Sequence, residues 1–287
     1  MRRDTHPAAE QVTAADGQSI AARFFAPAGE PKGAVLIAGA MGVAQEYYAA
    51  FARWVAAQGH LAVTFDYRGI GYSRPLRLRG FRADILDWAR LDCSAMINAV
   101  CARAPGKPLV WIGHSLGGQI LAFVPNRQHI AKFVTVACGS GYWRENTPQL
   151  RRRALWLWFV LVPAGIAVFG YFPGKRLRII GDLPKGAARQ WRRWCLNSSY
   201  AAGAEGEWAR AAYAAVTTPM VSLSLTDDEF MSTHSIDSLN ALYRSAPQTL
   251  LRIAPADAGV PRIGHFGFFR ESFEATLWRR FIAPEIV

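Results

Sequence analysis

Short apolar runs alternate with longer segments of helical periodicity along most of the chain, and this alternation limits what it can fold into. Seven runs have the length of strands: 19–25, 34–39, 61–66, 109–113, 133–137, 219–225 and 249–253. Helical patterns lie at 45–59 and 81–104, and a last helix is expected from near Phe268 towards Arg280. Strands that are apolar on both faces are typical of a parallel sheet between helices. The sequence therefore predicts an α/β protein with a mostly parallel central sheet flanked by helices.

The composition agrees with a folded α/β protein without disulfides. A length of 287 residues allows one large domain or two smaller ones, and 51 % hydrophobic residues suffice for a core. The four cysteines are scattered, with no C-x-x-C pair and no histidine at zinc-finger spacing, so we expect reduced thiols and no metal. No apolar stretch of the secretory kind follows the basic start. We therefore expect a cytoplasmic protein.

The alternation stops between residues 141 and 210, which we interpret as a helical cap on a core made of residues 1–140 and 211–287. Residues 154–172 carry no charge and are long enough to cross a membrane. A single crossing would separate the strands before and after it, which is impossible if they share a sheet. A proline and a glycine in the middle predict two short helical pieces. We expect a cap packed over the sheet, with contact to a membrane surface as the alternative.

The positive charge of the chain is concentrated in the same region. The net charge is +12, and residues 144–193 hold eleven Arg or Lys against two acidic residues, which gives +9. Such a cluster is explained by a solvated face, or by attraction to anionic lipid headgroups or an acidic substrate. No nucleic-acid-binding motif accompanies it, so we expect no nucleic-acid partner.

The run "LVWIGHSLGGQI" (109–120) carries the strongest chemical signal. Gly113, His114, Ser115, Leu116 and Gly117 fit the G-x-S-x-G nucleophile elbow, in which a serine lies on a tight turn between a strand and a helix. The turn requires small neighbours, and the N-terminus of the following helix favours developing negative charge. The sequence therefore predicts Ser115 as a nucleophile.

A serine nucleophile needs a histidine base, which should follow it in the chain after an acidic residue. Only His234 and His265 lie beyond the cap. His265 stands in "IGHFGFF", a loop after the last predicted strand, whereas His234 in "MSTHSI" is placed to open a helix. We expect His265 to be the base.

The acid should follow a strand of the second half. Asp227 and Asp228 come after the strand at 219–225, and Asp228 is three residues past its end. A helix cap or a solvated turn would explain the same pair. We favour Asp228, with Asp227 second and Asp257, which follows a different strand, as a weaker candidate.

Several motifs together resemble the α/β-hydrolase superfamily over most of the chain. They are "GAMGVAQEYY", "FDYRGIGYS", "GHSLGGQ", "QWRRWC" and "GHFGFFR", and in combination they are similar to predicted bacterial hydrolases of the serine aminopeptidase and monoacylglycerol lipase branch. The resemblance implies the α/β-hydrolase fold, with the helical cap inserted after the sixth strand. It matches the D-x-R-G-x-G-x-S loop of the family to Asp66, Arg68, Gly69, Gly71 and Ser73, for which we expect a structural turn.

The resemblance also implies an oxyanion hole. "LIAGAMG" (36–42) has Ala38 where many lipases and esterases of the family have histidine, and Ala40 matches the residue that donates one backbone N–H. Leu116 would donate the other, each worth typically about 3 kcal/mol. We take Met41, Trp156 and Trp158 as substrate-binding candidates.

Together these features predict a serine hydrolase that cleaves esters with hydrophobic acyl groups through an acyl-enzyme, without cofactor or metal. Aminopeptidase or amidase activity, acyl transfer with the same triad, and a catalytically silent module that binds membrane surfaces stay as alternatives. The expected partner is a small, lipid-like ester, with peripheral contact at the inner membrane surface through the basic, apolar cap.

Overall fold

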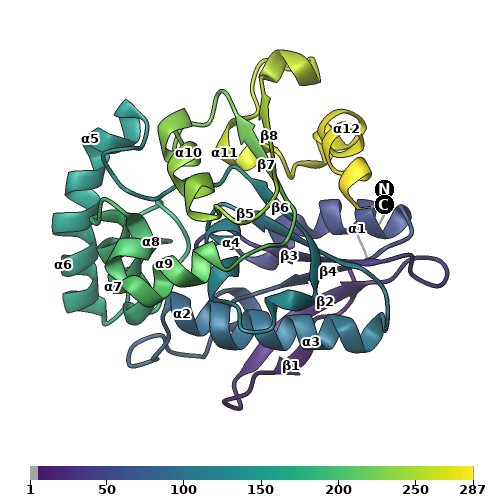
Figure 1. The fold of residues 1–287 in the computed structure, drawn as a ribbon. Helices are drawn as coiled ribbons and strands as arrows, with labels where there is room; N and C mark the ends of the chain where they lie inside the picture. The colour runs from purple at the N-terminus through teal and green to yellow at the C-terminus, as the bar shows by residue number, and fades with distance from the viewer. Residues whose placement is uncertain (1–5, 287) are drawn as a thin grey trace.

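One eight-stranded sheet forms the centre of the computed structural model, which describes residues 6–286 (Figure 1). The strands are β1 (Glu10–Thr13), β2 (Ser19–Phe25), β3 (Ala34–Ala38), β4 (Leu61–Phe65), β5 (Leu109–His114), β6 (Ile130–Val136), β7 (Met220–Leu225) and β8 (Gln248–Ile253). Their order is β1-β2-β4-β3-β5-β6-β7-β8. All neighbouring strands from β4 to β8 are parallel. The pairs β1–β2 and β2–β4 are antiparallel. The predicted α/β fold with a mostly parallel sheet is confirmed.

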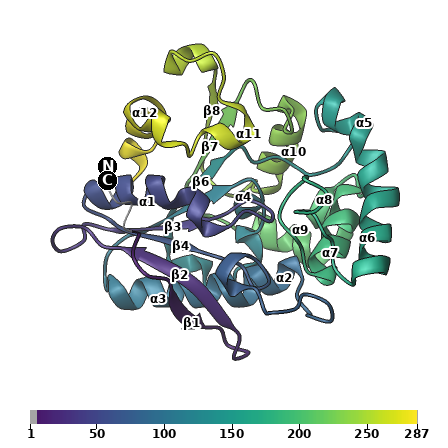
Figure 2. The same ribbon diagram turned by 180° about the vertical axis from the view of Figure 1, so that it is seen from behind.

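Helices cover both faces of this sheet (Figure 2). α1 (Ala49–Ala57) and the segment that ends in α12 (Arg279–Phe281) contribute to one hydrophobic cluster, which contains Phe51 and Trp278. α2 (Ile85–Asp87), α3 (Ser94–Arg103) and α10 (Thr233–Leu242) contribute to the other, larger cluster. Both faces are therefore covered, and β3, β4 and β5 are buried along their whole length.

Two elements differ from what the sequence indicates. The hairpin strand β1 escaped prediction because its four residues, "EQVT", are largely exposed and show no apolar period. The last helix, expected from Phe268 towards Arg280, is broken into short helical turns that begin with α11 (Gly264–Gly267). The chain bends at Arg270, whose backbone is extended, and the bend lets Phe268 and Trp278 pack in one cluster.

Five helices lie between β6 and β7, and we call them the cap. They are α5 (Pro148–Trp156), α6 (Val162–Phe169), α7 (Lys185–Cys195), α8 (Tyr200–Ala204) and α9 (Glu207–Ala214). Figure 1 shows them together at one side of the sheet. Because α9 continues past residue 210, that boundary falls inside a helix, and the division into cap and core stays a prediction.

The uncharged stretch of the cap is one helical run rather than two pieces. A π-helical segment, Leu157–Leu161, joins α5 to α6, so the helix continues from Pro148 to Phe169. Pro163 is the second residue of α6 and follows this wider turn, where a missing N–H is tolerated. The cap therefore presents one long helix along its outer side.

Candidate active site

Ser115 lies in the tight turn between β5 and α4 (Leu116–Gln119). Its φ is 50° and its ψ is −111°, a conformation that residues with a side chain rarely adopt. Such a backbone costs of order 1–3 kcal/mol and persists where the surroundings hold it in place. Backbone strain of this kind is typical of residues in functional sites.

Glycines make this turn possible, as the sequence predicts. A Cβ on Gly117 would lie 2.0 Å from the carbonyl oxygen of Ala38, and one on Gly113 would lie 2.5 Å from the Gly117 carbonyl carbon. Gly118 faces Cys138 in the same way, because its Cβ would lie 2.3 Å from Sγ. Side chains at these positions would force β3, β5 and α4 apart.

Asp228 and His265 meet at the same edge of the sheet. Asp228 follows β7, and His265 lies in α11, beyond β8. Asp228 Oδ2 lies 2.8 Å from His265 Nδ1. Both side chains are buried. Because a carboxylate only accepts hydrogen bonds, Nδ1 carries the proton, and Nε2 is left with a free lone pair in the neutral ring. This is the arrangement of a general base with its orienting acid.

The neighbours of Asp228 hold the histidine loop by its backbone. Asp227 Oδ2 accepts the N–H groups of Ile263 at 2.8 Å and Gly264 at 3.0 Å. Glu229 Oε2 accepts the N–H of His265 at 2.8 Å. Sequence reasoning missed Glu229, whose only signal was its place beside the acid pair.

The other candidates for acid and base lie elsewhere. The His234 side chain is 75 % exposed and lies 3.6 Å from Glu145. Asp257 accepts the backbone N–H of Ala254 at 2.8 Å, where it closes a turn. The structure therefore brings together Asp228 and His265 and leaves His234 and Asp257 in structural roles.

The Ser115 hydroxyl is free to react. Within the described residues Ser115 Oγ makes no hydrogen bond, and the residue is 9 % exposed. A hydrogen bond between nucleophile and base often tightens only in the complex with substrate.

Comparisons with known proteins agree with this architecture. Residues 29–169, just under half of the chain, match the family described as "Serine aminopeptidase, S33". A soluble variant of the monoglyceride lipase of Saccharomyces cerevisiae, solved with a substrate analogue, has a TM-score of 0.62 at 16 % identity over 88 % of this chain and 87 % of its own. No match was found among curated proteins.

Two further solved structures are similar over nearly the whole chain. A thermophilic esterase of Thermogutta terrifontis has a TM-score of 0.59 at 16 % identity, covering 97 % of this chain and 98 % of its own. A bacterial membrane phospholipase A, described as a virulence factor, has a TM-score of 0.57 at 14 % identity, covering 97 % and 86 %. The chain has the α/β-hydrolase fold. The match over residues 29–169 agrees with the predicted resemblance to the serine aminopeptidase and monoacylglycerol lipase branch.

A buried chain of hydrogen bonds ties three loops of this α/β-hydrolase fold together. His114 Nε2 lies 3.1 Å from the carbonyl oxygen of His265, so Nε2 carries the proton and Nδ1 accepts. The Tyr48 hydroxyl therefore donates to His114 Nδ1 at 2.8 Å, and its oxygen accepts the N–H of Ala40, also at 2.8 Å. Burial and the nearby His265 lower the pKa of His114 well below its ordinary value, so the ring is neutral.

This chain of hydrogen bonds corrects the predicted oxyanion hole. The Ala40 N–H is committed to Tyr48 Oη in this structure and is not free for an oxyanion. The sequence carried no sign of this, because Tyr48 reaches Ala40 only once α1 packs under β3. Met41, the next residue in the turn, has an N–H without a hydrogen bond among the described residues. Leu116 is the first residue of α4, where N–H groups lack a partner inside the helix.

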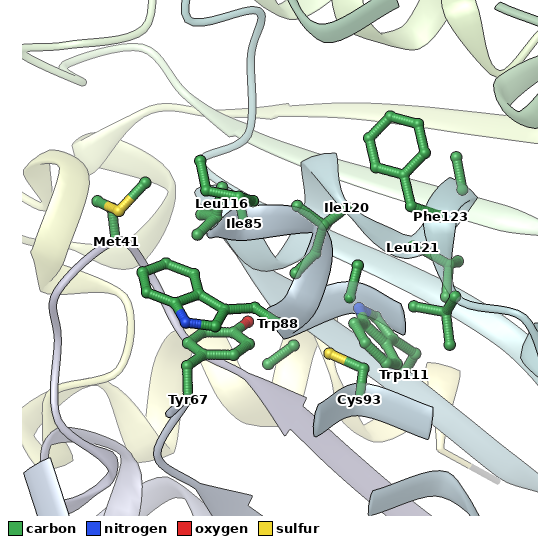
Figure 3. Packing of buried hydrophobic residues seen from close by; sticks show 14 of the residues in the cluster. Met41, Tyr67, Ile85, Trp88, Cys93, Trp111, Leu116, Ile120, Leu121 and Phe123 are labelled. Carbon is green, nitrogen blue, oxygen red and sulfur yellow. The ribbon is translucent and has the colours of Figure 1, made fainter. Parts of the chain in front are cut away.

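Two of the predicted substrate-binding residues are buried and the third is exposed. Met41 is buried in the larger cluster, and Figure 3 shows it and Leu116 among the apolar side chains there. Trp158 is also buried, but it packs edge to face on Trp191 within the cap, with ring centroids 4.8 Å apart. Trp156 is 64 % exposed on the outer side of the cap, so its assignment to the substrate pocket was wrong.

The polar side chains of the loop after β4 form hydrogen bonds that hold its structure, as we expect for this loop. Asp66 accepts the backbone N–H groups of Gln45 at 2.9 Å and Tyr72 at 3.0 Å. Burial raises the pKa of Asp66, and these donors act against that rise. Arg68 Nε donates to the buried Asp92 at 2.7 Å. A Cβ on Gly71 would lie 2.3 Å from the Asp66 carboxylate, so only glycine fits there.

Metal-ligating side chains do not gather in the part of the chain that the structure describes. No group of three or more His, Cys, Asp or Glu side chains lies there in a position to hold a metal ion. The chemistry available at the site is that of a hydroxyl, an imidazole, a carboxylate and backbone N–H groups.

Proposed function

We propose that this α/β-hydrolase cleaves carboxylic esters through Ser115, with His265 as base and Asp228 as the acid that orients it. The observation that carries the proposal is the buried Asp228–His265 pair at the sheet edge where Ser115 lies in a left-handed turn. The fold shared with a monoglyceride lipase and an esterase supports the ester class.

In the proposed reaction Ser115 Oγ attacks the ester carbonyl while His265 Nε2 takes its proton. Asp228 holds the ring through Nδ1 and stabilises the imidazolium. The protonated ring then gives its proton to the departing alcohol, which leaves an acyl-enzyme on Ser115. Water, deprotonated by His265, attacks this acyl group, and the acid product leaves with Ser115 restored.

The tetrahedral intermediates carry a negative oxygen that needs donors. We infer that the N–H groups of Leu116 and Met41 supply them, since that of Ala40 is bonded to Tyr48. Such donors are typically worth about 3 kcal/mol each. The apolar side chains of Met41 and Leu116 next to these groups favour a hydrophobic acyl chain.

The expected substrate is therefore a small ester of lipid-like character. Amide cleavage and acyl transfer would use the same three residues, so the experiments below include them as outcomes. Location in the cytoplasm, at the inner membrane surface, stays a prediction.

A fluorophosphonate probe, which labels activated serines, tests the nucleophile. We expect labelling of the wild type and none of Ser115→Ala, and His265→Ala should lose at least about three orders of magnitude in labelling rate. His234→Ala is the matched control and should label like the wild type, because His234 is exposed and away from the site. Equal labelling of wild type and Ser115→Ala would overturn the assignment.

The substrate class is tested with p-nitrophenyl esters of increasing chain length, p-nitroanilides, and an added alcohol as acyl acceptor. We expect kcat/KM to rise from the acetate to medium-chain esters, with the anilides far slower. A steep preference for acetate would contradict the hydrophobic acyl site, and faster anilide cleavage would favour an amidase. Transfer to the alcohol in preference to water would indicate an acyltransferase. Ser115→Ala serves as the blank.

A further inference from the structure

The long cap helix carries an apolar stripe that no part of the described chain covers. Its exposed apolar residues recur with the period of a helix and form what we call the outer face: Leu155, Trp156, Phe159, Val160, Pro163, Ala164, Ala167 and Val168. Trp156 is 64 % exposed, Phe159 55 % and Val168 63 %. Large apolar side chains this exposed and this contiguous mark an interaction surface.

The opposite side of the same helix packs against the rest of the protein. Ala154, Trp158, Val162 and Ile166 are buried in the larger cluster. By length and composition alone the run Pro148–Phe169 could cross a membrane, yet only 28 % of its most apolar part is buried, unlike a core helix. The outer face is therefore additional to the packing of the protein.

A crossing is excluded by the sheet. The helix lies between β6 and β7 in the chain, and these strands pair in parallel, with Phe133 opposite Met220. Both ends of the helix must therefore lie on one side of any bilayer. A helix with an exposed apolar face and basic surroundings suits the plane of the interface, where its apolar side sinks about 5–10 Å into the headgroup region.

Basic residues surround the outer face. They are Arg151, Arg152 and Arg153 at its start, Lys175, Arg176 and Arg178 after its end, and Lys185, Arg189 and Arg192 on the adjacent α7. None of these side chains forms an ion pair with an acidic residue of the described chain. They are therefore free to meet anionic headgroups.

A groove of about 460 Å³ between α6 and α7 has one apolar side and one basic side. Val162, Pro163, Ile166 and Ala167 line its apolar side, and Lys185, Arg189 and Arg192 line the other. Arg192 is held in place, because Nε donates to the Trp158 carbonyl and the guanidinium lies 5.3 Å from the centre of the Phe159 ring. An anionic headgroup would meet the three cations while the start of its acyl chain lies along α6.

The geometry points to a bilayer containing anionic phospholipid as the partner of the outer face, with one phosphate headgroup in this groove. A second copy of the chain is disfavoured because two such faces would bring like charges together: the window 144–193 alone carries +9. The inference concerns binding and is independent of the proposed ester hydrolysis.

Vesicle sedimentation tests it, with phosphatidylcholine vesicles against vesicles that also contain phosphatidylglycerol. We expect the wild type and Ser115→Ala to sediment with the anionic vesicles and to be released by salt. Trp156→Ser with Phe159→Ser should weaken binding at least about tenfold. Lys185→Gln and Arg189→Gln should each weaken it about fivefold, since a basic residue near such a surface is worth about 1 kcal/mol.

Matched controls are taken away from the cap. Leu76→Ser removes a fully exposed apolar side chain, and Arg279→Gln removes an exposed cation; both should bind like the wild type. Unchanged circular dichroism spectra show that the variants fold. Hydrolysis of a short soluble ester, measured separately, distinguishes failure of this proposal from failure of the esterase. Equal sedimentation of cap variants and wild type would overturn the docking face.

Two further outcomes would contradict it. A wild type that forms dimers in solution, which Trp156→Ser with Phe159→Ser dissociates without any vesicle binding, would assign the face to a second copy. Binding that soluble inorganic phosphate abolishes at low ionic strength, with no effect of the Trp156 and Phe159 changes, would assign the groove to free phosphate.

Discussion

Three consecutive carboxylates after β7 each hold a different part of the histidine loop. Asp227 accepts two backbone N–H groups, Asp228 accepts from the His265 ring, and Glu229 accepts the His265 N–H. Only Asp228 touches the imidazole. The other two fix where the imidazole stands, so they act as positioning residues.

Exchange of these carboxylates for amides separates the two roles. Asp228→Asn should lower kcat for ester hydrolysis by about four orders of magnitude, because the amide leaves the wrong ring nitrogen protonated. Asp227→Asn should lower it by less than about tenfold, since its amide oxygen still accepts from Ile263 and Gly264. Steady-state kinetics on one p-nitrophenyl ester decides the matter. A larger loss in Asp227→Asn than in Asp228→Asn would exchange their assignments.

Residue types and order alone make Ser115, Asp228 and His265 the candidates, because the elbow glycines and the strand ends are local features. Ala40 shows where that reasoning stops. Whether its N–H is free depends on Tyr48, which lies eight residues on and reaches it through the packed core. Trp156 failed for a related reason: a helix with two apolar faces does not reveal from its pattern which of them the fold covers.

Among the elements, α7 connects the cap to the core and to its own neighbours. Gln190 Oε1 accepts the backbone N–H groups of Ile85 at 2.6 Å and Leu86 at 3.2 Å, which caps the start of α2. Gln190 Nε2 donates at 2.8 Å to Glu205, which follows α8. Trp194 Nε1 donates to the same Glu205 oxygen at 2.6 Å, and Arg193 pairs with it.

Glu205 makes the cap sensitive to acid. Burial alone would raise its pKa, but the hydrogen bonds from Trp194, Gln190 and Arg193 outweigh burial and hold the pKa below its ordinary value of 4.5. A lowered pKa means that this contribution to stability is present above pH 4.5 and is lost as the pH falls through the folded-state pKa. Glu205→Gln should therefore lower Tm at pH 7, and this difference should shrink progressively as the pH falls below 4.5.

The measurement is thermal denaturation followed by circular dichroism over that pH range. Glu207→Gln is the matched control, because Glu207 is 90 % exposed and its nearest cation is 4.0 Å away. A Glu205→Gln difference that stays constant from pH 7 to pH 3 would contradict the assigned role.

Strand positions followed closely from the sequence, since buried parallel strands are apolar runs that end sharply. β2 begins and ends as predicted, and β4 and β7 differ by one residue at one end. Elements with polar or mixed surfaces were less visible. β1 is an exposed edge strand. The helix Pro148–Phe169 is continuous because of a π-helical turn, which the spacing of residues in the sequence does not predict.

At the scale of the molecule, cap and core share one hydrophobic cluster. Trp88 and Trp111 of the core belong to the same cluster as Trp158 and Trp194 of the cap. The cap also reaches the back of the nucleophile turn, where the Tyr200 hydroxyl donates to Gln119 at 2.7 Å. The cap is therefore part of what holds Ser115 in place.

Such sharing predicts that cap and core unfold together. Differential scanning calorimetry should give one transition with equal calorimetric and van't Hoff enthalpies. Trp194→Ala, which empties a fully buried site, should shift that single transition down by the equivalent of about 3–5 kcal/mol. Phe159→Ser, on the exposed side of the same cap, is the control and should shift it little. Two separate peaks, of which only one moves in Trp194→Ala, would show an independent cap.

The cysteine thiols have a consequence for how this protein can be handled. All four cysteines are free, and burial raises the pKa of each thiol, Cys138 behind the nucleophile turn included. Little thiolate forms at neutral pH, so alkylating agents and mild oxidants find few reactive sulfurs in the native protein. Reagents that modify the nucleophile of cysteine hydrolases should therefore leave the proposed chemistry of Ser115 unchanged.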